Sequence, residues 1–390
     1  MPVLPQKQDC CGCSACGLVC SRQAITISTD SEGFKYPILN LSLCIECKCC
    51  EKVCPIIHRD NTERKKSYKF IYAVQHKNME TLFYSSSGGA FSAIAEYVFS
   101  CGGAVVGVEY SETMEVRHAF AYSMKEAGRF RGSKYVQSNL GRIFQDIKSY
   151  LGSGKLLLFT GTPCQVQALK LYLRKSYSNL ITVDLICHAV PSPLYFEQYV
   201  IFLNRIFGKQ LTSIMMRDKA TAGWSHKFSY RYSFIDGTDI VDPSKVSNWG
   251  RIFFSQLLNR PSCYKCRFTN LDRVGDITIA DYWDDSNKRT DIYSSKGMSL
   301  FFVNSEVGVM ILNSIKENLR MWQLSEEEAM QPCLQYPPSV SPKRNEFWQY
   351  YHTYGFQKSY MRYFTDPIYV RIKKMIKIYL KSLLRRNIRI

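Results

Sequence analysis

The segments CCGCSACGLVC (10–20) and CIECKCCEKVC (44–54) decide the fold of the N-terminal part of the chain. Each contains the spacing C-x2-C-x2-C-x3-C, and Pro55 follows the second. Three thiolates at this spacing wrap one corner of a metal–sulfur cube, and the fourth ligand must arrive from elsewhere. Zinc prefers two C-x2-C pairs to such a triple. The repeated spacing therefore predicts two iron–sulfur clusters, with zinc as the alternative.

Over about 50 residues this pattern resembles a two-cluster bacterial ferredoxin domain, in which each fourth cysteine serves the other cluster. One departure is Ser21, where a proline often follows the fourth cysteine. Cys11 and Cys49 lie off the spacing, and we do not expect them to be ligands. The expected ligands of one 4Fe–4S cluster are Cys10, Cys13, Cys16 and Cys54. Those of the other are Cys44, Cys47, Cys50 and Cys20.

The composition excludes a disordered chain and a secreted disulfide scaffold. Of the 390 residues, 46% are hydrophobic and 22% charged, enough for two or three domains at roughly 150 residues each. The N-terminus, MPVLPQKQDCCGC, lacks the basic and apolar regions of a signal peptide, and no uninterrupted apolar run of membrane-spanning length occurs. We therefore expect a cytoplasmic location, where the 16 cysteines stay reduced and bind metal or do redox work.

The order of apolar patterns predicts three domains in an α/β fold, α+β overall. Residues 1–60 form the small ferredoxin-like domain, 61–330 a larger mixed-sheet domain, and 331–390 a Pro-rich segment with a helical tail. Residues 213–260 look irregular, and DITIADYW (276–283) and FFVN (301–304) look like strands. Further strands are expected at Phe70–Gln75, Ala104–Glu109, Lys155–Thr160 and Ile181–Cys187. Helices are expected at Gly88–Ser100, Leu140–Leu151, Gln165–Lys175, Leu194–Phe207 and Phe347–Phe364.

A second, scattered set of cysteines lies in the large domain. Cys164 and Cys187 each follow a strand-like run, where an α/β sheet presents its site. Cys263 and Cys266 form a C-x2-C pair. Four thiolates suffice for one more 4Fe–4S cluster. From spacing alone, buried structural cysteines plus a zinc or redox pair are an equally good interpretation.

Six ordered motifs within residues 69–305 resemble the beta-subunit family of coenzyme F-420 hydrogenases and dehydrogenases. They are SSSGGAF (85–91), GSKYVQS (132–138), FTGTPCQVQAL (159–169), VDLICHAVPSP (183–193), RPSCYKCRF (260–268) and DITIADYW (276–283). The resemblance implies FAD beside a third 4Fe–4S cluster, held by Cys164, Cys187, Cys263 and Cys266. Ala189 replaces a usual glycine, and ADYWDD (280–285) replaces GDFWG, so the substrate cannot be carried over.

The same resemblance places FAD at the start of the helix expected at Gly88. Ser86, Ser87, Gly88 and Gly89 offer hydroxyl groups and approachable backbone amides to a pyrophosphate at this helix N-terminus. From the residues alone, a serine-rich N-cap without ligand fits equally well. No G-x-G-x-x-G fingerprint is present. The remaining candidate cofactor residues are Lys134, Tyr135, Asp276 and Asp281.

Two further features bear on catalysis and partners. His188, next to Cys187, is the best-placed histidine for proton transfer, although a lone histidine is more often structural. Residues 366–390 carry eight Lys or Arg and one Asp, a net +7 of the chain's +18. This basic amphipathic helix predicts either peripheral contact with a membrane or docking on the protein itself. The rest has no dense basic stripe, so we expect no nucleic-acid partner.

The cysteine patterns, together with the family resemblance, which implies FAD, predict an iron–sulfur flavoprotein oxidoreductase. It would pass electrons between ferredoxin-type clusters and FAD, and so reduce or oxidise a bound small molecule. We expect a redox partner, either a ferredoxin or another electron donor or acceptor. The resemblance implies deazaflavin as substrate only in organisms that make it. Similar bacterial proteins accompany cell-surface polysaccharide genes, which suggests a sugar-linked reaction. The alternative is a non-catalytic electron-transfer subunit that serves a partner enzyme.

Overall fold

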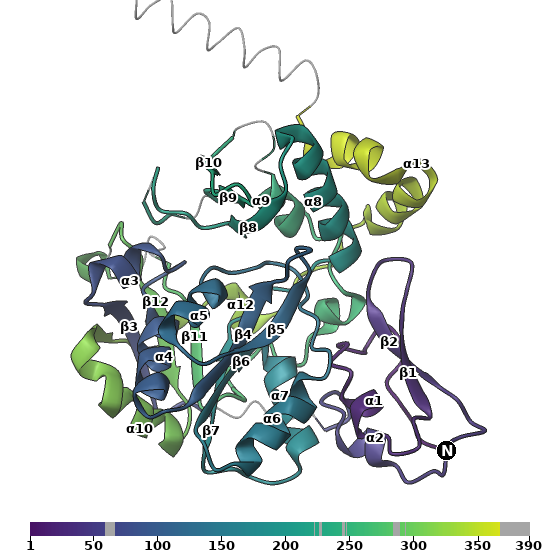
Figure 1. Cartoon of the computed structure of the whole chain (residues 1–390), viewed down its shortest axis with the longest axis horizontal. Helices are drawn as coiled ribbons and strands as arrows, with labels where there is room; N and C mark the ends of the chain where they lie inside the picture. The colour runs from purple at the N-terminus through teal and green to yellow at the C-terminus, as the bar shows by residue number, and fades with distance from the viewer. Residues whose placement is uncertain are drawn as a thin grey trace, which may run out of the picture.

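The computed structural model describes residues 1–58, 67–221, 223–225, 228–243, 246, 248–283, 289–292 and 294–366. Its N-terminal part is a β-hairpin flanked by two short helices (Figure 1). The Asp30 side chain accepts hydrogen bonds from the amides of Glu32 and Phe34 and so shapes the hairpin loop. These elements are α1 (Ala15–Val19), β1 (Ile25–Thr29), β2 (Lys35–Leu39) and α2 (Cys49–Lys52).

An eight-stranded mixed sheet forms the centre of the fold. In spatial order its strands are β13 (Leu319–Gln323), β3 (Phe70–His76), β12 (Ser299–Val303), β11 (Ile277–Asp281), β7 (Leu180–Leu185), β6 (Leu157–Gly161), β4 (Ala104–Tyr110) and β5 (Val116–Ala121). The neighbours β11, β7, β6 and β4 run parallel, and the other pairs are antiparallel. The predicted fold class, α/β with a mixed sheet, is confirmed. All six predicted strands are present within two residues of their expected bounds.

Helices cover both faces of this sheet, which explains why its strands are continuous apolar runs. On one face, α4 (Ala90–Ser100) and α10 (Glu306–Ile315) pack on side chains such as Val105 and Phe301. On the other, α6 (Ile143–Gly152) and α7 (Pro163–Leu173) pack on Val106 and Phe159. Cys13, Ala15 and Val53 belong to this second core, so the N-terminal part packs directly against α6 and α7.

A third layer lies beyond the carboxyl ends of the parallel strands (Figure 1). It holds α8 (Pro193–Phe207), α9 (Trp249–Phe254), α13 (Arg344–Phe364), and a small antiparallel sheet of β8 (Leu211–Met215), β9 (Arg231–Phe234) and β10 (Asp239–Val241). Its core is aromatic and includes Tyr199, Trp249 and Tyr360. The expectation that residues 213–260 are irregular is therefore wrong in part. Their strands are short, so the alternation of apolar residues is weak in the sequence.

The remaining elements are short. They are α3 (Met79–Phe83), α5 (Met124–Ala127), α11 (Glu326–Ala329), α12 (Pro332–Gln335), η1 (Gly128–Phe130), η2 (Pro261–Lys265), η3 (Thr290–Ile292) and η4 (Lys316–Asn318). The Pro-rich segment thus contains one helical turn, α12. The predicted basic helix at 366–390 lies outside the described residues, apart from Asp366. Within the described part of the chain, no helix combines the length and hydropathy needed to cross a bilayer.

Candidate cofactor sites

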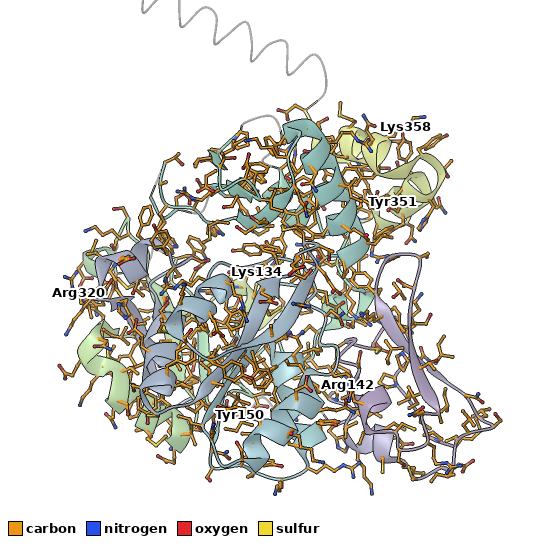
Figure 2. The ribbon with its side chains drawn as sticks, viewed as in Figure 1. Lys134, Arg142, Tyr150, Arg320, Tyr351 and Lys358 are labelled. Carbon is orange, nitrogen blue, oxygen red and sulfur yellow. The ribbon has the colours of Figure 1, made fainter. Side chains whose placement is uncertain are left out.

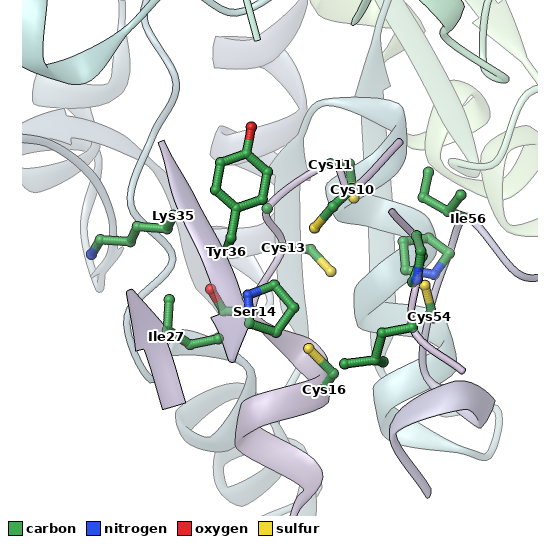
Figure 3. Close-up of a pocket in the computed structure, with 15 residues that line it drawn as sticks. Cys10, Cys11, Cys13, Ser14, Cys16, Ile27, Lys35, Tyr36, Cys54 and Ile56 are labelled. Atoms are coloured by element: carbon green, nitrogen blue, oxygen red, sulfur yellow. The ribbon is translucent and has the colours of Figure 1, made fainter. Parts of the chain in front are cut away.

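Cys10, Cys13, Cys16 and Cys54 line one open cavity of about 400 Å³, and their sulfur atoms face a common space (Figure 3). The chain can turn tightly between them because Gly12 and Ser14 adopt left-handed conformations, with φ of 72° and 60°. Cys16 lies in α1, whereas Cys54 arrives from the end of α2. The structure therefore brings together the four cysteines predicted to share the first cluster, including the one from the other run.

Cys20, Cys44, Cys47 and Cys50 line a second open cavity, of about 350 Å³. Here Glu46 and Lys48 take left-handed conformations, so this run turns in the same way as the first. Cys47 is exposed, whereas Cys50 is buried. These are the four cysteines predicted for the second cluster. They again combine three from one run with the fourth from the other.

The third set of cysteines lines a larger open cavity, of about 760 Å³. Cys164 lies in the first turn of α7, directly after β6, and Cys187 lies two residues after β7. Cys263 is in η2, and Cys266 follows it. The carboxyl ends of two parallel strands and one separate turn thus meet at this cavity, as ligand sites in α/β sheets do. The structure brings together all four cysteines predicted for a third cluster.

The chemistry of these thiols fits an iron–sulfur cluster. Burial raises the pKa of Cys16 and of Cys263 to about 12, and that of Cys187 well above its usual value. A metal must therefore displace protons and stabilise thiolates in a water-poor environment. Within the described residues, no three His, Cys, Asp or Glu side chains are placed to hold a single metal ion. Four thiols spread around an open cavity suit a cluster in which each thiolate binds a separate iron.

Three cysteines that the sequence left without a role lie beside these cavities. Cys11 lines both the first and the third cavity, and Cys49 lines the second. The sulfur of Cys333 lies 3.4 Å from Nδ1 of His188. Cys101, by contrast, is exposed at the end of α4. In the sequence, Cys11 and Cys49 could be connected with the cluster sites only because each stands next to a predicted ligand, Cys10 or Cys50.

His188 lines the third cavity. Its Nε2 lies 2.8 Å from the side-chain amide of Gln256, and its ring packs against Phe253 and Phe254. Burial lowers the pKa of His188, so the neutral imidazole is favoured. If the Gln256 amide donates to Nε2, the proton resides on Nδ1 and points toward Cys333. His188 is thus held firmly beside the cysteines.

The Ser86–Gly89 loop is hydrogen-bonded to Met298 and Ser299 at the start of β12, in addition to its connection to α4. The amide of Gly88 donates to Ser299 Oγ at 2.8 Å, so the expectation that Gly88 offers its amide to an anion is corrected. A Cβ at this position would lie 2.2 Å from the carbonyl oxygen of Val74, which explains the glycine by packing. Ser87 Oγ donates to the Met298 carbonyl. Gly89, at φ 85°, forms the N-cap of α4.

Lys134 and Tyr135 lie close to this loop, since Ser133 donates its amide to Ser86 Oγ. Lys134 is inside the fold (Figure 2), where its ammonium donates to the carbonyls of Arg129 and Arg131 at 2.7 and 2.9 Å. Burial lowers the pKa of Lys134 to about 7. The Tyr135 ring packs against Phe228 and Phe253. Both side chains are therefore engaged with the protein itself in this structure.

The two candidate aspartates lie at opposite ends of β11. Asp281 ends the strand, at the same edge of the sheet as Cys164 and Cys187. Asp276 precedes the strand, and its carboxylate accepts hydrogen bonds from Thr182 and from Ser305 Oγ. The structure does not bring Asp276 to the cysteine cavity or to the Ser86–Gly89 loop. Asp276 instead links β7 to the N-terminus of α10, because Thr182 lies in β7 and Ser305 is the N-cap of α10.

Sequence reasoning missed a group of aromatic and cationic side chains beside Tyr135. The Arg217 guanidinium lies 4.4 Å from the Phe228 ring and 4.9 Å from the Trp283 ring, and it donates to the Tyr135 hydroxyl. Trp283 in turn stacks on Trp224, with ring centroids 4.6 Å apart. The buried ammonium of Lys219 donates to the carbonyl of Ser87 at 2.6 Å. Since the segment between β8 and β9 meets Tyr135 and Trp283 from distant parts of the chain, no local pattern in the sequence marks this group.

Comparisons with known proteins found one family match and a distant structural likeness. Residues 154–328 match the family model for the C terminus of the beta subunit of coenzyme F-420 hydrogenase/dehydrogenase. A solved structure of the F-420-reducing NiFe hydrogenase complex from Methanosarcina barkeri, derivatized with xenon, has 16% identity and a TM-score of 0.46. The match covers 75% of this chain and 90% of that one. No curated protein matches the chain. The predicted resemblance is confirmed: residues 154–328, which hold all four cysteines of the third cavity, match the family of coenzyme F-420 hydrogenase and dehydrogenase beta subunits.

Proposed function

We propose that this chain is an iron–sulfur flavoprotein oxidoreductase with three 4Fe–4S clusters and one FAD. The observation that carries the proposal is the grouping of the twelve predicted ligand cysteines around three cavities, four of them at each, where Cys11 and Cys49 are additional lining residues. The sequence separates the members of the third group by as many as 102 positions, from Cys164 to Cys266. The convergence of thiols that are far apart in the sequence on one open cavity supports a bound cofactor with thiolate ligands.

The cysteines of each cavity would hold one cluster through their sulfur atoms. When bound, such clusters supply one-electron transfer, and a flavin supplies the exchange between single electrons and a hydride equivalent. The chain itself supplies burial: two of the four ligands at the first cavity, Cys13 and Cys54, are buried, which excludes water from their side of the site. The exposed Cys47 at the second cavity suits exchange with a redox partner.

The proposed flavin site comprises the Ser86–Gly89 loop, Lys134, Tyr135 and Asp281. The support is proximity: Ser86 is hydrogen-bonded to Ser133, and the charge of Asp281 acts on both Tyr135 and Lys219. Arg217 is a permanent cation, and an anionic ligand here would also favour the protonated forms of Lys134 and Lys219, whose pKa values burial lowers to about 7. In this proposal the Ser86 hydroxyl and the amide of Gly89 orient the ligand, because Ser87 Oγ already donates to the Met298 carbonyl. The candidate for proton transfer is His188, whose Nδ1 lies 3.4 Å from the sulfur of Cys333 beside the neighbouring cavity.

The substrate is a small molecule whose identity is a further proposal. A sugar-linked reduction in cell-surface polysaccharide metabolism and a deazaflavin reaction are both consistent with membership of this family. The competing function is a subunit without a substrate of its own, which delivers electrons to a partner enzyme. One observation favours this function: Lys134 and Tyr135 are already in contact with protein groups, and a flavin could bind them only by displacing those contacts. We propose a cytoplasmic location for either function.

Anaerobic purification followed by iron, sulfide and flavin analysis tests the proposal. About twelve irons and one FAD per chain are expected for the enzyme. About eight irons without flavin would favour the electron carrier. Replacement of Cys164 or Cys263 by serine should remove about four irons, while the matched replacement Cys101→Ser, at an exposed position, should remove none. Zinc with no visible absorbance would overturn both redox functions.

A further inference from the structure

Arg260 is the buried cation that the proposed function leaves without a role. The residue is only 1% exposed. Its guanidinium donates to the carbonyl of Cys10 at 2.6 Å, to the side-chain oxygen of Gln137 at 3.0 Å and to the carbonyl of Lys35 at 2.9 Å. It also lies 4.3 Å from the centroid of the Tyr36 ring. All of these partners are formally neutral, so none of them balances the positive charge.

Two other arginines with little exposure are paired with carboxylates. Arg273 forms an ion pair with Asp184, and Arg344 forms one with Glu32. The acidic residues on the neighbouring hairpin are engaged elsewhere: Glu32 pairs with Arg344, and Asp30 pairs with Lys7 at 2.9 Å. A buried charge without a counter-ion is costly, and proteins retain one where a ligand supplies the opposite charge.

The guanidinium lies between two of the cysteine cavities. Arg260 itself lines the third cavity, and Cys10, whose carbonyl it binds, lines the first. A Cβ on Gly12, another residue of the first cavity, would lie 2.5 Å from Nη1 of Arg260. Glycine at position 12 is therefore required by its φ of 72° and by contact with this side chain. The second cavity does not include Arg260 or its hydrogen-bond partners.

We infer that Arg260 is the shared counter-ion of the first and third cysteine sites and raises the reduction potentials of both. A four-iron cluster with four thiolates is a net anion, and reduction adds a further negative charge. A fixed cation beside the cluster stabilises the reduced form more than the oxidised form, so it shifts the potential upward. This inference rests on the proposed cofactors. Arg260 is a positioning residue: it holds the Cys10 turn against the third site and sets the charge between them.

Redox titration of the anaerobically reconstituted full chain, followed by electron paramagnetic resonance, tests the inference. In Arg260→Met, two of the three midpoint potentials should shift to more negative values, whereas the third, assigned to the Cys20 site by its loss in Cys20→Ser, should stay unchanged. Arg260→Lys keeps the charge, so its midpoint potentials should stay close to those of the parent protein. All three potentials unchanged in Arg260→Met, with iron content intact, would overturn the inference.

A second variant neutralises the charge without removing the arginine. Gln137→Glu places a carboxylate where Nη1 of Arg260 already donates at 3.0 Å. It should lower the same two potentials as Arg260→Met. Gln137 also donates to the carbonyl of Cys11, so Gln137→Leu is the matched control for loss of that bond and should leave the potentials near those of the parent protein. Equal shifts in Gln137→Glu and Gln137→Leu would overturn the charge role.

Iron content separates failure of this inference from failure of the proposed function. A parent protein that binds no cluster at the Cys164 site overturns the proposed cofactors and the inference with them. If the parent protein binds all three clusters and neither Arg260→Met nor Gln137→Glu shifts their midpoint potentials, only the inference is overturned. If Arg260→Met loses iron, the Gln137→Glu result decides, because that variant keeps the packing of the arginine.

Discussion

Asp184 and Arg273 form a fully buried ion pair, with 3.0 Å between Oδ1 and Nη2 and side chains that are 0% and 1% exposed. Asp184 lies in β7, three residues before Cys187, and it also accepts hydrogen bonds from the amides of Val274 and Gly275. The pair therefore ties the strand that leads to Cys187 to the loop that follows Cys266. Two ligand candidates far apart in the sequence owe their common position to this contact.

Breaking this pair should damage both the fold and the third site. Asp184→Asn leaves the Arg273 charge buried without its counter-ion, so we expect a loss of about 3–5 kcal/mol in unfolding free energy. Chemical denaturation of the iron-free protein measures this loss. Glu346→Gln breaks the half-exposed pair with Arg362 and serves as the control, with an expected change of about 0–1 kcal/mol. Equal effects of the two variants would contradict the prediction.

The crossed pairing of the N-terminal cysteines predicts which cluster each variant loses. Cys20→Ser should remove the cluster at the second cavity, although Cys20 belongs to the first run. Cys54→Ser should remove the cluster at the first cavity. Each variant should lose about four irons. The paramagnetic resonance spectrum of Cys20→Ser should match that of Cys47→Ser and differ from that of Cys13→Ser; a match to Cys13→Ser would disprove crossed pairing.

His118 predicts a specific dependence of stability on pH. Burial lowers the pKa of His118 to about 4, while Nε2 bonds the carbonyl of Thr160 and the ring stacks on Phe159. The unfolded chain binds a proton below about pH 6.5 and the folded protein does not, so stability is lost as the pH falls from 6.5 toward 4. Between pH 7.5 and 4.5 this amounts to about 2–3 kcal/mol.

Comparison of the parent protein with His118→Phe isolates this contribution, because carboxyl groups elsewhere titrate in both proteins. Denaturation midpoints at pH 7.5 and 4.5 should fall less in His118→Phe than in the parent. The substitution keeps an aromatic ring against Phe159, so it preserves much of the packing. An identical pH response in the two proteins would show that the histidine is solvated or already charged in the fold.

The variant Gly88→Ala tests whether this glycine is needed for folding or for ligand binding. Gly88→Ala places a methyl group 2.2 Å from the Val74 carbonyl oxygen, so we expect the flavin-free protein to lose about 1–3 kcal/mol or more. Gly152→Ala is the matched control, since nothing lies within 4 Å of a Cβ at that helical position, and it should be neutral or stabilising. Thermal unfolding of both flavin-free variants is the measurement. Unchanged stability in Gly88→Ala would leave ligand contact as the reason for the glycine.

Local spacing predicted three of the four cysteines that meet at each N-terminal cavity, since each run repeats C-x2-C-x2-C, and the ferredoxin resemblance supplied the fourth. The third group depended on the family resemblance, because strand ends far apart in sequence meet only when the sheet order is known. Gly88 was predicted for its amide, yet its environment is set by β3 and β12, which no local pattern reveals. Arg260, Arg217 and Trp283 were missed for the same reason: their partners come from distant loops.

The small hairpin of the N-terminal part has a consequence for protein engineering. Its loop meets α8, because a Cβ at Gly33 would lie 2.3 Å from that of Leu194, and Ser192 Oγ donates to the carbonyl of Glu32. Ala15 and Val53 also share a core with α7, so residues 1–58 are packed against the rest of the molecule at two places. Residues 1–58 therefore cannot be exchanged as an independent module. Replacement of this part by a ferredoxin from another protein would require redesign of both surfaces of the contact.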